Sequence, residues 1–147
     1  MRLSTSRFGE VNFAQEDIIT FPEGILGLES NLRYLILRPP ESKPFLWLQS
    51  VDDPQVALPV IPPDLLVPDY QVDLTAELKA ELQLEKNEKP EIYCIVYSEK
   101  EPKSTTVNLL TPLVVNSAKR LACQVMVEKK SYTSRHNLFE LLSLPKS

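Results

Sequence analysis

Phe45-Leu46-Trp47-Leu48-Gln49-Ser50-Val51-Asp52-Asp53-Pro54 is the stretch of sequence that decides the fold. It contains the only tryptophan of the chain and is apolar, apart from Gln49 and Ser50, until an Asp-Asp-Pro turn. Such a run predicts a β-strand with both faces covered, because Asp bonds nearby backbone in turns and Pro presets φ. A second apolar run at residues 56–61 predicts a hairpin, with Pro59 at an edge or a bulge.

Proline and glycine usage favours many short strands over long helices. The 147 residues include 13 prolines and three glycines, and the proline share is well above the usual ~5%. Proline is excluded from helix interiors and central strand positions. Runs of strand length lie at residues 3–6, 11–13, 18–21, 32–37, 45–51, 56–61, 92–97, 107–110, 113–115 and 121–127. We therefore expect a mostly β fold, a small antiparallel barrel-like single domain over residues 1–147.

One or two short helices complete the predicted fold. Leu74, Leu78 and Leu82 recur every fourth residue, which predicts a helix of two to three turns. Asp73 is the expected N-cap, and the helix should end in the charged stretch at residues 86–90. Residues 138–142 at the other end of the chain predict a short helical turn.

Composition limits the class of protein. The net charge of −4 and the pI of about 5.1 argue against direct nucleic-acid binding. No apolar run approaches the ~20 residues that cross a bilayer, and the first residues lack the apolar core of a signal peptide. We expect a soluble, cytoplasmic chain without a membrane segment, in which Cys94 and Cys123 are buried free thiols.

The sequence offers little catalytic chemistry. One histidine and two separated cysteines predict no metal site and no cofactor. His136 follows Ser134 closely, so a hydrolase using this pair is one hypothesis, although a turn histidine with one hydrogen bond is the simpler interpretation. Asp52 and Asp53 are adjacent, point to opposite sides of an extended chain, and are better explained as turn formers. We predict that the protein is not an enzyme.

Several segments resemble one known family, the bacterial flagellar assembly factor FliW. The most specific is residues 44–54, and the others are residues 8–10, 17–25, 68–70 and 106–116, with Gln124, Tyr132, Arg135 and His136 near the end. Together they cover most of the chain. The sequence departs from the family pattern at Leu26, Leu28, Val107, Thr111 and Asn137. The larger side chains at Val107 and Thr111 are expected to alter a packed turn or a partner surface.

The resemblance implies a role in flagellum biogenesis through exchange of protein partners. FliW-like proteins bind the RNA-binding translational regulator CsrA and prevent it from repressing flagellin synthesis, and flagellin competes as the other partner. The resemblance thus implies a chaperone-like regulator of translation with CsrA and flagellin as partners. A small barrel that binds an oligonucleotide directly is the alternative, and it needs a basic groove with exposed aromatic rings.

Seven residues are candidates for partner binding. Gln49, Ser50 and Asp52 are expected as exposed polar contacts at the strand end. Phe45 and Trp47 are either core or contact residues, since tryptophan is enriched in interface hot spots. Asn108 and Asn116 lie among strand residues, where they either bond local backbone in a turn or face the partner.

Overall fold

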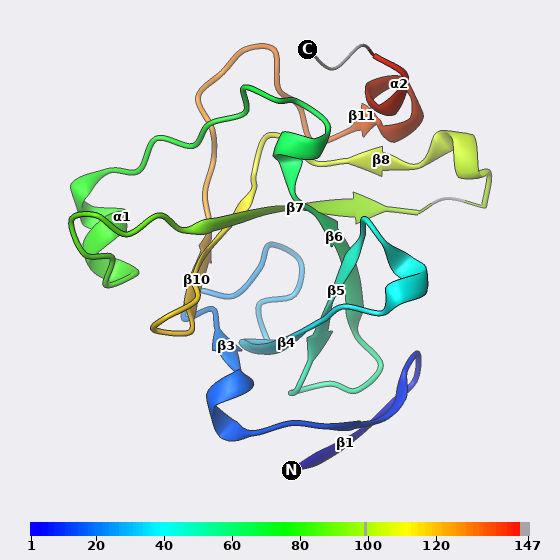
Figure 1. Ribbon diagram of the computed structural model, residues 1–147, viewed down its shortest axis with the longest axis vertical. Helices are drawn as coiled ribbons and strands as arrows, with labels where there is room; N and C mark the ends of the chain where they lie inside the picture. Colours follow the sequence, from blue (N-terminus) through cyan, green and yellow to red (C-terminus); the bar gives the residue numbers. More distant parts are fainter. Residues whose placement is uncertain (99, 145–147) are drawn as a thin grey trace.

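Seven strands close into a ring in the computed structural model, which describes residues 1–98 and 100–144 (Figure 1). They are β3 (Ile19–Thr20), β4 (Arg33–Leu37), β5 (Leu46–Ser50), β6 (Ala57–Ile61), β7 (Glu91–Tyr97), β9 (Leu113–Asn116) and β10 (Leu121–Gln124). Each strand pairs antiparallel with the next, and β10 returns to β3 through a parallel pairing of Leu121 with Thr20. The predicted mostly β, antiparallel barrel is confirmed.

Shorter elements surround the ring. The hairpin of β1 (Arg2–Thr5) and β2 (Gly9–Asn12) precedes it, and β8 (Thr106–Val107) and β11 (His136–Asn137) extend the sheet beyond the end of β7. The α-helices of the described residues are α1 (Ala76–Glu81) and α2 (Leu138–Ser143), as predicted. The 3-10 helices are η1 (Gln15–Asp17), η2 (Pro40–Ser42), η3 (Pro63–Leu65) and η4 (Pro102–Ser104). Proline begins three of these four turns, because its fixed φ suits a first helical position.

Strand β7 is buried on both faces, which explains its continuous apolar sequence. Tyr93 and Ile95 point into the barrel, where they join Phe21, Tyr34 and Leu48. The alternate residues Cys94 and Val96 point outward into a second core. A strand with two buried faces has a continuous run of apolar residues, without the alternation of polar and apolar residues that a half-exposed strand shows.

The second core lies outside the barrel and is covered by segments from the later part of the chain. Leu66 and Tyr70 come from the segment after η3, and Tyr132 and Leu138 come from the C-terminal part. These green and orange-to-red segments lie on one side of the ring in Figure 1. A third, smaller cluster packs Leu78 and Leu82 of the α1 region against β9 and β10.

Two local predictions need correction. Helix α1 begins at Ala76 and not after Asp73, because the hydroxyl of Thr75 accepts a hydrogen bond from the Leu78 amide at 3.1 Å and caps the helix. Strand β6 is an inner strand and not an edge, since it pairs with both β5 and β7. Pro59 fits there because the pairing with β7 covers only Val60 and Ile61.

The predicted strand at residues 121–127 ends early as a regular element. The amides of Val125 and Val127 still donate to the carbonyls of Pro112 and Leu110, in the same register as β10 and β9. The carbonyls of Val125 and Val127 receive no hydrogen bond from Pro112 or Leu110 in exchange. Proline has no N–H, and the Leu110 amide donates to Asn108 Oδ1 instead. Residues 125–127 are therefore an extended segment held along one edge by single bonds.

Two buried tyrosines give a matched test of this packing. The hydroxyl of Tyr34 lies in the barrel core with no hydrogen-bond partner among the described residues, and burial, together with the charge of Asp52, raises its pKa to about 12. The hydroxyl of Tyr70 donates to the buried carbonyl of Leu109 at 2.7 Å. We expect Tyr34→Phe to leave the free energy of unfolding unchanged or slightly raised, and Tyr70→Phe to lower it by about 1–3 kcal/mol.

Urea unfolding followed by the fluorescence of Trp47 measures both variants on the same scale. Excitation selective for tryptophan restricts the signal to one residue, since the chain has one tryptophan among its aromatic residues. An equal loss of stability in the two variants would show that the Tyr34 hydroxyl has a partner after all.

Candidate protein-binding surface

Trp47 lies on the outer face of β5, half-buried under the N-terminal hairpin. Its strand neighbours Leu46 and Leu48 pack against the barrel core, so Trp47 points the opposite way. The Arg7 guanidinium carbon is 4.5 Å from the centroid of the indole, and the Phe8 ring meets it edge-on at 5.5 Å. The indole Nε1 donates to Ser42 Oγ at 3.3 Å. The indole is thus held in place on three sides while it remains partly accessible.

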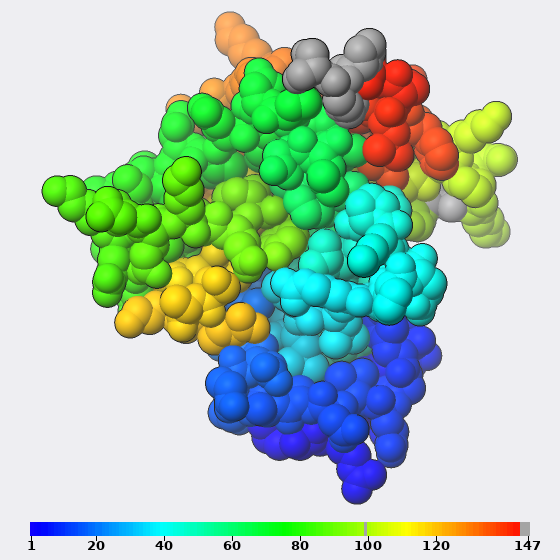
Figure 2. All heavy atoms as spheres, viewed as in Figure 1, coloured from blue at the N-terminus to red at the C-terminus, as the bar shows by residue number. Residues whose placement is uncertain are grey.

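A surface pocket opens beside this indole, and we call it the Trp47 pocket. Its volume is about 340 Å³. Its apolar lining comes from Phe45, Trp47, Pro59, Val96, Pro102, Leu138 and Phe139. Figure 2 shows the cyan residues around η2 and the red residues of α2 next to each other, and both contribute to the pocket. Glu41 and Lys43 also line the pocket, so charges of both signs accompany its apolar surface.

Helix α2 is fixed to the barrel by its N-cap. Asn137 accepts a hydrogen bond from the Glu140 amide at 2.9 Å and donates through Nδ2 to the Lys103 carbonyl at 2.8 Å. Leu138 is buried beneath the helix, whereas Phe139 is 47% exposed at the pocket. Asn137 therefore has a structural role, because it caps α2 and links it to η4.

The expectation that Gln49 and Ser50 are exposed is wrong, since both are fully buried. Gln49 Nε2 donates to backbone carbonyls of Ser50 and of the following turn at 3.0–3.2 Å. Ser50 Oγ donates to Asn31 Oδ1 at 2.6 Å and accepts from the amides of Asp52 and Asp53. Ser50 Oγ and Gln49 Nε2 thus close the turn after β5, as buried polar groups usually find partners. Gln49 Oε1 is the exception, since it is buried without a hydrogen-bond partner among the described residues.

Asp52 is exposed as expected, but its carboxylate is engaged within the chain. It accepts hydrogen bonds from the amides of Leu32 and Arg33 and forms an ion pair with the Arg33 guanidinium at 2.8 Å. Partial burial favours the neutral acid, but the hydrogen bonds and the charge of Arg33 outweigh it and hold the pKa of Asp52 below its usual range. Asp53 accepts from the Gln55 amide, so the interpretation as a turn former is confirmed for Asp53. The Asp52 carboxylate instead joins the turn to the start of β4.

Asn108 and Asn116 are buried, and both are hydrogen-bonded within the chain. Asn108 Oδ1 accepts from the amides of Leu110 and Thr111, and its Nδ2 donates to Thr111 Oγ1 at 2.6 Å. Thr111 is thus held by a hydrogen bond within the packed turn. Asn116 Nδ2 donates to the carbonyls of Leu82 and Gln83, which fixes the end of α1 to β9.

The hydrolase hypothesis gains no support from the geometry around His136. Its Nε2 accepts a hydrogen bond from the Thr133 amide at 2.8 Å, so the lone pair that a general base needs is already used. Burial lowers the pKa of this imidazole. Within residues 1–98 and 100–144, no three His, Cys, Asp or Glu side chains are grouped to hold a metal ion, and neither α-helix has the length and apolar character to span a membrane.

Of the seven candidates, the structure places Phe45 and Trp47 together at a surface pocket and Asp52 at the surface elsewhere. The sequence reasoning missed Phe139, Leu138 and Pro59, which complete the pocket. The predicted helical turn at residues 138–142 was the available signal for Phe139. Its place beside β5 depends on how the C-terminal segment returns to the barrel, which no local pattern shows.

Comparison with known proteins gives a consistent result. Residues 2–138 match the sequence profile of the FliW protein family. The flagellar assembly factor FliW of Syntrophus aciditrophicus is 38% identical over 140 residues, which cover 95% of this chain and 89% of that protein. The FliW of Bdellovibrio bacteriovorus is 37% identical over 97% of this chain and 81% of its own length. A crystal structure of the flagellar assembly factor FliW superposes with a TM-score of 0.85 at 30% identity and covers 94% of this chain and 96% of that chain.

The Asp52 contacts predict a pH-dependent contribution to stability. A carboxyl whose folded pKa is lowered stabilises the protein above its unfolded pKa of ~3.9, and this contribution is lost as the pH falls through the folded value. We expect Asp52→Asn to lower the free energy of unfolding at pH 7 by about 1–2 kcal/mol, since the carboxylate accepts charge-assisted bonds.

Urea unfolding of both proteins at pH 7 and near pH 3 measures this difference. The loss in free energy of unfolding caused by Asp52→Asn should be smaller at the lower pH. Asp53→Asn is the control, because it retains an acceptor for the Gln55 amide and should lose less stability at both pH values. A deficit of the same size at both pH values would contradict the ionic origin.

Proposed function

The chain belongs to the FliW family of flagellar assembly factors, and from this premise we propose that it regulates flagellin synthesis by exchanging two protein partners. It binds a CsrA-type RNA-binding regulator and relieves its repression of translation. Flagellin competes for the protein and thereby frees the regulator. This function needs two mutually exclusive complexes in the cytoplasm and no bond-making step.

Similarity along the whole chain carries this proposal. The family profile matches residues 2–138, and the relatives named as flagellar assembly factors align with more than nine tenths of the chain. The net charge of −4 favours encounter with a basic RNA-binding protein more than it sets the affinity.

The Trp47 pocket is the surface that we propose for partner contact. It combines a rigidly held indole with the exposed ring of Phe139, and large aromatic side chains in a partly desolvated pocket are typical of interface hot spots. Asp52 lies outside the pocket lining, and its carboxylate forms an ion pair with Arg33. We therefore expect it to affect partner binding only indirectly, through the turn that it stabilises.

Calorimetric titration with purified CsrA and with flagellin, separately and in competition, tests the proposal. We expect binding to each and displacement of one by the other. Phe139→Ala should lower the affinity for the partners by roughly 10-fold or more, because it removes a hot-spot contact. Leu65→Ala is the matched control, because Leu65 is 48% exposed and lies outside the pocket lining.

Two results would overturn the proposal in different ways. Binding to neither partner by the folded protein would mean that family membership does not carry the exchange function here. Normal binding by Phe139→Ala, with displacement intact, would preserve the function and exclude the Trp47 pocket as its surface. Salt-sensitive binding to structured RNA without either protein would favour the oligonucleotide alternative.

A further inference from the structure

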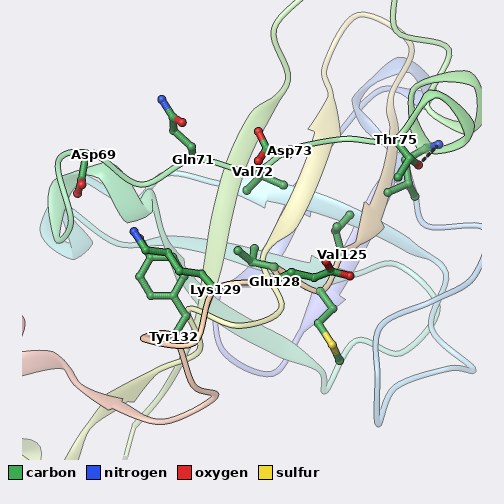
Figure 3. A pocket seen from close by; sticks show the side chains of 12 residues that line it. Asp69, Gln71, Val72, Asp73, Thr75, Val125, Glu128, Lys129 and Tyr132 are labelled. Atoms are coloured by element: carbon green, nitrogen blue, oxygen red, sulfur yellow. Dashed lines mark hydrogen bonds between the residues drawn. The ribbon is translucent and has the colours of Figure 1, made fainter.

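A second surface lies on the other side of the second core, between the segment that leads into α1 and the extended segment after β10. This groove has a volume of about 490 Å³. Figure 3 shows residues Asp69 to Thr75 along one side and residues Val125 to Tyr132 along the other. We propose that it binds an extended, basic segment of a partner protein, which adds as a strand to the edge at residues 126–128. The groove shares no lining residue with the Trp47 pocket.

An unpaired backbone edge is the first reason for this assignment. The amides of Val125 and Val127 donate toward Leu110 and Pro112. Residues alternate along an extended chain, so Met126 and Glu128 present their N–H and C=O groups on the opposite edge. In the described part of the chain these groups have no hydrogen-bond partner, and Met126 is 66% exposed. The groove is lined by residues 125–128 and not by residues 110–112, so it lies on the side of this segment away from its paired neighbour.

The opposite side of the groove is also an extended segment with free backbone groups. Gln71, Val72 and Asp73 form no backbone hydrogen bond within the described residues. Open strand edges are templates for pairing with another chain, and proteins use them for recognition by strand addition. Two such segments bordering one groove offer main-chain partners to a peptide laid between them.

The side chains of the groove define the chemistry of its occupant. The floor is apolar, because Val72, Val125 and Val127 pack into the cores below. Three carboxylates line it, those of Asp69, Asp73 and Glu128. Lys129 is the cation of the lining, and its Nζ lies 4.9 Å from the centroid of the Tyr132 ring. A strand that alternates apolar and basic residues matches this floor and this excess of negative charge.

The test uses a synthetic probe and neither CsrA nor flagellin, so its outcome is independent of the proposed function. The probe is an acetylated, amidated octapeptide in which lysine and valine alternate. The control peptide has proline at two central valine positions, where it cannot complete a strand ladder. Nuclear magnetic resonance of the labelled full chain follows the amides of Met126 and Glu128, which should shift and become protected from exchange when the probe binds.

Two kinds of variant separate the backbone from the charge contribution. Met126→Pro removes one unpaired N–H and should lower the affinity for the probe peptide by roughly 3- to 10-fold, which is the range of one hydrogen bond. Met126→Ala keeps this N–H and should bind the probe with unchanged affinity. Asp73→Asn combined with Glu128→Gln leaves the backbone intact. This double variant should weaken binding at low salt and reduce its salt dependence.

Each other outcome counts against the proposal. No binding up to about 1 mM probe at low salt would overturn it. Equal binding of the proline peptide, or shifts confined to residues outside the groove, would exclude strand addition. If sedimentation shows that the free chain dimerises and Met126→Pro dissociates the dimer, the edge belongs to a second copy of this chain and not to a basic partner.

Discussion

The burial of both faces of β7 is the constraint on which the rest of the structure depends. Tyr93 and Ile95 fill the barrel, so Cys94 and Val96 on the other face need a separate cover. The chain supplies that cover with the segment after η3 and with its C-terminal part. The two candidate surfaces are consequences of this cover: Val96 and Leu138 line the Trp47 pocket, and Val72, Val127 and Tyr132 line the groove.

Polar side chains in the buried turns serve the architecture and not the surface. Ser50, Asn108 and Asn116 each bond backbone or a neighbouring side chain at the point where a strand ends. A buried polar group without a partner is costly, so these positions have little freedom to serve a ligand as well. What remains for recognition is apolar surface, exposed charge and unpaired backbone.

The sequence predicted the elements better than their surroundings. Apolar runs located β5, β6 and β7, and prolines marked the ends of most segments, because these signals are local. Exposure was not predictable for Gln49 and Ser50, since their polarity suggests solvent and only the packed turn shows that it serves internal bonds. The Trp47 pocket joins residues 45 and 139, and the groove joins residues 72 and 127, so tertiary contacts alone create both.

The position of the two surfaces bears on how partner exchange would work. Both rest on the second core, where close-packed side chains such as Leu66, Tyr70 and Tyr132 leave one arrangement in the structure. Coupling between distant sites requires an element with two arrangements that each ligand biases differently. In the exchange proposed above, overlap of the two partners at one surface is the simplest way to make their binding mutually exclusive, because it needs no second arrangement of this core.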